Sequence, residues 1–168
     1  MESVNKLENK LAATYKGLPH LPADVKKWIA QNVWWMAIVS VVFSVFGVIS
    51  LIAVTFFASA VLVGFGGYAG AAVAAAGGFA LLSVGVSIAF MIVELIVMGM
   101  AISPLHGMQK KGWTFIFIAA LIQAASYVVS FLYSFNLFGL VWNLLILAVG
   151  VYFLFEIRDH FAGKKDKK

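Results

Sequence analysis

The chain has 168 residues, of which 63% are hydrophobic and 11% are charged, with a mean hydropathy of +1.00. Such a composition leaves too little polar surface to cover a soluble globule, so we expect an integral membrane protein. The chain contains no cysteine, which excludes disulfides, thiolate catalysis and cysteine metal sites. The net charge of +5 comes from basic residues beside the hydrophobic runs. Orientation and anionic lipid headgroups explain that placement more simply than nucleic acid does.

The N-terminal segment, residues 1–23, is predicted to form an amphipathic helix over residues 2–18 and then an elbow. Apolar side chains recur in the helix at steps of three and four, at Val4, Leu7, Leu11, Tyr15 and Leu18. The helix could lie in the headgroup plane, pack beneath the bundle, pair with a second subunit, or fold back on its own chain. Pro19 and Pro22 stiffen the elbow. Pro22 and Asp24 suit the first turn of the next helix.

Residues 24–157 form the predicted transmembrane domain, because they hold four apolar runs long enough to cross a bilayer. The runs cover roughly residues 33–57, 78–102, 113–133 and 137–155. A tight turn at Ser134–Asn136 makes the last two spans an antiparallel hairpin. Residues 58–78 are uncharged and glycine-rich, and we expect a surface turn there, with extended helices as the alternative. A phosphate loop is disfavoured because no Lys-Ser/Thr pair follows the glycines.

The boundaries of these spans carry the residues typical of a membrane interface, where lysines lie in the headgroups and tryptophans at the hydrocarbon edge. These predicted interface residues are Trp28, Trp34, Trp35, Lys110, Lys111, Trp113 and Arg158. All 12 Lys and Arg residues lie before the first span, in the connection 103–112 or in the basic tail 158–168. Both termini are therefore expected in the cytoplasm. We expect a multi-pass protein of the cell membrane, which in bacteria is the inner membrane.

The expected fold is thus an all-α bundle of four transmembrane helices with an N-terminal cytoplasmic amphipathic helix. Small residues at three- and four-residue spacing predict faces on which a neighbouring helix can pack closely. One face runs along the first span and the other leads into the second; together they comprise Ser40, Ser44, Gly47, Ser50, Gly70, Ala74 and Gly78.

Several boundary segments resemble a group of small, uncharacterised four-helix bacterial membrane proteins. They are the two prolines followed by Val25-Lys26, the pair Trp34-Trp35, the start of the third span at Lys110–Trp113, and the exit Tyr152–Arg158. The resemblance covers most of the chain and implies the four-helix topology. It implies no activity and no site residues.

Glu94 is the main candidate site residue, because no other Asp, Glu, Lys, Arg or His lies between Trp28 and His106. An ionisable residue at bilayer depth is a functional-site hypothesis. Counting residues from the span ends places Ser44 and Gln123 at a similar depth, with Asn143 nearer the outer face. Glu94 could line a polar path or bind a proton or cation. Alternatively, it is neutral and hydrogen-bonds across two helices, which we favour because no intramembrane cation is present.

No catalytic or metal-binding motif is recognisable, so we expect neither an enzyme nor a cofactor. His20, His106 and His160 lack the spacing of a helical metal pair. Aromatic clusters such as Phe131–Phe135 could dock a lipid, quinone or pigment, although interfacial belts explain them more simply.

Three functions follow from these observations. The first is a non-catalytic scaffold or accessory subunit that associates with itself or other membrane proteins through helix packing. The second is a small oligomeric channel or transporter for protons, cations or small solutes that uses Glu94. The third is a factor that binds lipid or the membrane surface, with the basic tail on anionic headgroups.

Overall fold

The structure is a computed structural model that describes every residue except 1, 16, 66–69 and 163–168. The described part is entirely helical, which confirms the predicted all-α class. Its six helices are α1 (Glu2–Tyr15), α2 (Ala23–Phe65), α3 (Gly70–His106), α4 (Lys110–Ser134), α5 (Leu137–Glu156) and α6 (Arg158–Ala162).

Helix α1 begins at Glu2 as predicted but ends at Tyr15, before the predicted end at Leu18. The elbow leads into α2 as expected. Lys26 donates its backbone N–H to the carbonyl of Pro22 at 3.1 Å, so the proline sits where its own missing donor costs nothing. Asp24 lies in the first turn of α2, where a carboxylate faces the positive end of the helix dipole.

Four of the helices, α2 to α5, are long and apolar enough to cross a membrane. The prediction of a surface turn over residues 58–78 was largely wrong, because α2 continues to Phe65 and α3 begins at Gly70. Alanine, the best helix former, recurs on both sides of the connection and outweighs the glycines. Residues 66–69, at the centre of the loop-like glycine pattern, lie outside the described part. The second span was expected to end near residue 102, yet α3 runs on to His106.

The predicted hairpin between the last two spans is confirmed. Phe135 takes a left-handed conformation with a φ of 49°, and its N–H donates to the carbonyl of Phe131. The side chain of Asn136 then accepts a hydrogen bond from the N–H of Gly139 at 2.9 Å and caps α5. Two residues therefore suffice to reverse the chain.

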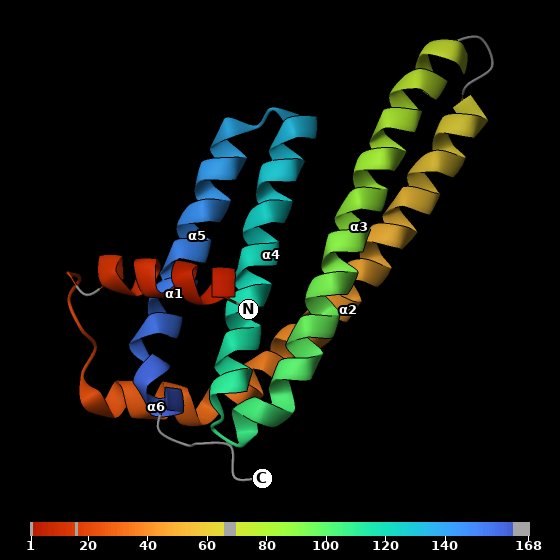
Figure 1. Cartoon of the computed structure of the whole chain (residues 1–168). Helices are drawn as coiled ribbons and strands as arrows, with labels where there is room; N and C mark the ends of the chain where they lie inside the picture. Colours follow the sequence, from red (N-terminus) through yellow and green to blue (C-terminus); the bar gives the residue numbers. More distant parts are fainter. Residues whose placement is uncertain (1, 16, 66–69, 163–168) are drawn as a thin grey trace.

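The helices form two hairpins that are joined at one end and separate toward the other (Figure 1). We call the joined end the base: it holds the start of α2, the α3–α4 connection at Gly107–Gln109, and α6. The open end holds the α4–α5 turn. Helix α2 runs along the base before it rises beside α3, while α1 crosses α5. The α2–α3 hairpin reaches farther than the α4–α5 hairpin.

The fully buried side chains gather at the base. Trp113, Phe117 and Phe161 are the largest, and they pack with Leu105 and Ile157. Small residues from α2 and α3, among them Ala30 and Ala101, complete this core. Helix α6 lies within the predicted basic tail, residues 158–168, and contributes Phe161 to the core. The core thus joins both hairpins at one end only.

The small-residue face predicted on the first span is divided between two environments. Gly47 contacts α3, since a Cβ added to it would lie 3.2 Å from the Met91 side chain. Ser44 is partly buried, whereas Ser40 and Ser50 are exposed. Gly78 has nothing packed against it within 4 Å. The surroundings of Gly70 and Ala74 lie outside the described part of the structure.

A close approach of α3 and α4 gives a test of the base. A Cβ added to Gly112 would lie 2.6 Å from the backbone nitrogen of Leu105 and 2.8 Å from the carbonyl carbon of Pro104. Backbone atoms cannot rotate away, so Gly112→Ala should lower the free energy of unfolding by about 1–3 kcal/mol. Thermal unfolding in detergent, followed by circular dichroism, measures the shift. Gly150→Ala is the control, because nothing lies within 4 Å of its Cβ position. Equal melting temperatures for the two variants would contradict this packing.

Candidate functional site

Glu156 joins the two ends of the chain at the base. Its side chain, 5% exposed, closes α5 and faces the elbow and the start of α2. One carboxylate oxygen lies 2.7 Å from Nδ1 of His20, and the other lies 2.9 Å from Nζ of Lys26. The second oxygen also accepts the backbone N–H of Leu21 at 2.9 Å. A buried carboxylate needs such partners, because desolvation disfavours its charge.

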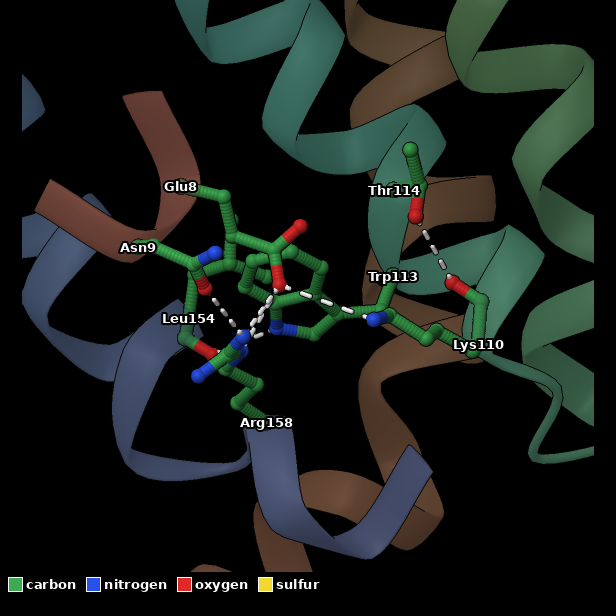
Figure 2. A network of polar contacts seen from close by, with 7 residues as sticks. All are labelled: Glu8, Asn9, Lys110, Trp113, Thr114, Leu154 and Arg158. Atoms are coloured by element: carbon green, nitrogen blue, oxygen red, sulfur yellow. Dashed lines mark hydrogen bonds and ion pairs between the residues drawn. The ribbon is translucent and has the colours of Figure 1, made fainter. Parts of the chain in front are cut away.

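Glu8 makes a second buried ion pair, which joins α1 to α6 (Figure 2). Its side chain is 2% exposed, and Oε1 lies 2.6 Å from an Nη atom of Arg158. The Nε of Arg158 donates to the same oxygen at 2.8 Å, and Lys110 lies 3.8 Å away. The guanidinium also stands 5.9 Å from the ring of Trp113. Arg158 therefore links α1, α4 and α6.

Aromatic side chains complete the polar contacts of the base. The indole N–H of Trp113 donates to the carbonyl of Leu154 at 2.7 Å (Figure 2), and the hydroxyl of Tyr152 donates to the carbonyl of Pro19 at 2.5 Å. The ring of Tyr15 stacks on Phe155 with centroids 5.2 Å apart, and burial raises the pKa of its hydroxyl. Helix α1 thus packs against the side of α5. Of the four arrangements predicted for this helix, packing with the bundle is the nearest to the one observed.

A cleft lies between α3 and α4, and one residue of α2 also borders it. The two helices separate toward the open end (Figure 1). The volume of the cleft is about 450 Å³. Hydroxyl groups dominate its polar lining, with aliphatic side chains and one phenyl ring between them. The lining residues are Leu51, Ser83, Val84, Val86, Ser87, Phe90, Ser126, Val129, Ser130, Tyr133 and Ser134.

The packing of the helices also fixes the level of Glu94. Gly112 meets Leu105 at the base, and Ser87 and Ser130 line the same cleft toward the open end. Antiparallel helices with an equal rise keep this register, which puts Glu94 level with Gln123 of α4. The contact between Gly47 and Met91 likewise puts Ser44 of α2 level with Glu94.

Asn143, the fourth predicted member, lies elsewhere. It lines a cavity of about 80 Å³ between α4 and α5, together with Tyr127, Ser130 and Asn136. Tyr127 lies one helical turn from Gln123 on α4. The four residues are therefore spread over α2 to α5, and their joint action stays a prediction.

Polar side chains at the base and on the hairpins differ in whether they have hydrogen-bond or ion-pair partners. Both buried carboxylates of the base are paired. In contrast, the side chains of Glu94, Gln123, Ser126 and Ser130 make no hydrogen bond to another residue within the described ranges. Among the fully buried side-chain polar atoms of the described residues, Nδ1 of His160 is recorded without a partner.

The predicted interface residues fall into two groups. Trp28 and Trp35 are 57% and 54% exposed, as expected of side chains that meet lipid headgroups. Trp113 is instead fully buried in the core, and Arg158 pairs with Glu8. Of the other side chains predicted there, Lys110 and Lys111 are exposed, and Trp34 packs edge-on against His106.

Two features escaped the sequence analysis. The ion pairs of Glu8 and Glu156 join residues 150 and 136 positions apart, and no local pattern announces them. The serines of the cleft did have a signal, because Ser126, Ser130 and Ser134 recur at four-residue spacing on α4. Ser83 and Ser87 repeat that spacing on α3.

No family model matches this sequence, and no curated protein or solved structure resembles it significantly. Function is therefore inferred from the residues of the site and their geometry.

The ion-pair network of the base predicts the effect of Glu156→Gln. The variant keeps the size of the side chain but removes the charge that faces Lys26 and His20, so Lys26, 23% exposed, loses its anion. Hydrogen bonds to charged groups contribute about 1.5–3 kcal/mol, and we expect a loss of unfolding free energy in that range. Denaturant titration of the purified protein in mixed micelles measures it.

Asp159→Asn serves as the matched control, since Asp159 is an exposed neighbour that makes no ion pair within the described part. It should leave the titration midpoint unchanged. A midpoint for Glu156→Gln equal to that of the control would show that the pairing does not stabilise the base.

Proposed function

We propose that this protein is a multi-pass membrane protein that acts without catalysis, as a small scaffold or accessory subunit that packs its helices against other membrane proteins or copies of itself. Four helices of sufficient length and hydropathy support the membrane location. The described basic residues of α2, α4 and α6, such as Lys26, Lys110 and Arg158, lie at the base. By the positive-inside rule, the base and both termini face the cytoplasm.

The length of the α2–α3 hairpin is the observation that carries the scaffold proposal. From Val33 to Phe65, α2 is uncharged, and at 1.5 Å per residue this stretch spans roughly 50 Å. The hydrocarbon core of a bilayer is only about 30 Å thick. Such a surplus of apolar length is accommodated by strong tilt or by protein neighbours, and it promotes helix association.

The outward face of α2 is available for such a neighbour. Helix α2 packs on α3 and, at the base, on α6. The opposite side carries Phe43, Phe46, Val54 and Phe57, which are 63–74% exposed. Lipid tails can cover apolar side chains equally well, so exposure alone does not argue for a partner. The excess length of α2 and the separation of the α2–α3 hairpin from α5 do argue for a partner.

Photocrosslinking tests the scaffold. Benzoylphenylalanine placed at Phe46 or Phe57 keeps an aromatic residue on the outward face of α2. After irradiation of native membranes, we expect discrete protein adducts from both positions. The same substitution at Phe138 on α5, 80% exposed, is the control and should give lipid adducts only. Lipid adducts alone at all three positions would contradict a scaffold role.

A second candidate, a small oligomeric channel or transporter, is favoured by one observation. Ser44, Glu94 and Gln123 lie level on three neighbouring helices, by the register set out above. Their polar atoms lack hydrogen-bond partners in the described part of the chain. A carboxyl group in such a layer can take up a proton or a cation.

Flux through proteoliposomes tests this candidate. Glu94→Gln keeps the shape of the side chain but cannot ionise, so it should abolish proton or cation flux, measured with an entrapped pH dye or with tracer ions. Glu94→Asp, which retains the carboxyl, should retain part of the flux. Equal rates in the wild type and Glu94→Gln, or the absence of any flux, would exclude the role of Glu94.

A further inference from the structure

We propose that the cleft between α3 and α4 binds an uncharged, single-chain amphiphile from the bilayer, such as a long-chain alcohol or a monoacylglycerol. The proposal rests on the membrane location argued above. The cleft is a different surface from the one proposed for helix partners. It lies between α3 and α4, whereas helix partners would pack on the outward face of α2.

Two hydroxyl groups supply the polar end of the site. Ser126 and Ser130 line the cleft from successive turns of α4, and neither makes a hydrogen bond to another described residue. In hydrocarbon no water is present to hydrogen-bond an unpaired hydroxyl, so leaving it unpaired costs free energy. One hydroxyl or carbonyl group of a ligand can bridge both serines, because residues four apart on a helix are neighbours.

The charge of the lining selects the kind of head group. The residues that border the cleft include no Asp, Glu, Lys, Arg or His. Glu94 and Gln123 lie deeper, at the next turn toward the base, and a lipid phosphate would find no cation in the lining. An uncharged head that both donates and accepts hydrogen bonds is therefore the match.

The size of the cleft suits a lipid chain. Its volume of about 450 Å³ falls within the roughly 300–1,000 Å³ of small-ligand sites. An alkyl chain can lie against Leu51, Val84 and Phe90 of its lining.

The tail contributes less to selectivity than the head does. Membrane lipid is as apolar as these side chains, so moving an alkyl chain from bilayer to cleft gains little. Recognition then depends on the serine hydroxyls, and a plain alkane should bind no better than bulk lipid.

Photoaffinity labelling of the full chain in phosphatidylcholine nanodiscs tests the site. The probe is hexadecanol that carries a diazirine in its chain, and mass spectrometry locates the labelled peptides. We expect saturable labelling within residues 83–90 and 126–134. Unlabelled hexadecanol should compete with the probe, and hexadecane should not.

Variants separate this site from general lipid contact. Ser126→Ala with Ser130→Ala removes both hydroxyls and should lower saturable labelling about five-fold. Ser40→Ala with Ser50→Ala, on exposed positions of α2, is the matched control and should leave it unchanged. Three results would overturn the proposal: labelling linear in probe concentration and spread over α2 and α5, equal labelling of the cleft variant, or equal competition by hexadecane. None of them bears on crosslinking from α2.

Discussion

The pairing of two buried carboxylates with cations from the other end of the chain is the interaction on which the rest of the structure depends. Glu8 binds Arg158, and Glu156 binds Lys26 and the elbow beside it. Removing one partner of a buried pair strands the other charge, which is why such pairs resist partial disruption. The base therefore holds α1, the start of α2 and α6 as one unit, around the core of Trp113 and Phe161.

Above the base, no ion pair between the two hairpins is recorded among the described residues. In water an open cleft between apolar helices would collapse, but lipid covers apolar surface without penalty, so the hydrophobic effect gives the hairpins no reason to close. What the bilayer cannot supply is hydrogen bonds. The unpaired serines of α4 and the layer around Glu94 are consequently the places where another molecule has most to contribute.

The sequence predicted those features that depend on nearby residues. Hydropathy over some 20 residues located the four long helices, and Ser134–Asn136 located the hairpin turn. Counting residues also placed Ser44, Glu94 and Gln123 at similar depths, because the rise of a helix is constant. Which side of each helix faces its neighbour depends on packing, so Gly47 contacts α3 while Ser40 and Ser50, predicted on the same face, are exposed. The ion pairs of the base depend on the fold of the whole chain and left no local pattern.

The elbow and the exit from α5 meet although 136 positions separate His20 from Glu156. During synthesis, Lys26 and Glu8 are therefore made long before their partners leave the ribosome. Until then the first hairpin stands in the membrane without its base, and the early ion-pair partners remain hydrated. The ion pairs of the base can therefore form only after the chain has been made as far as Arg158. A chain stopped before Glu156 would retain the four hydrophobic helices but would lack both ion pairs of the base.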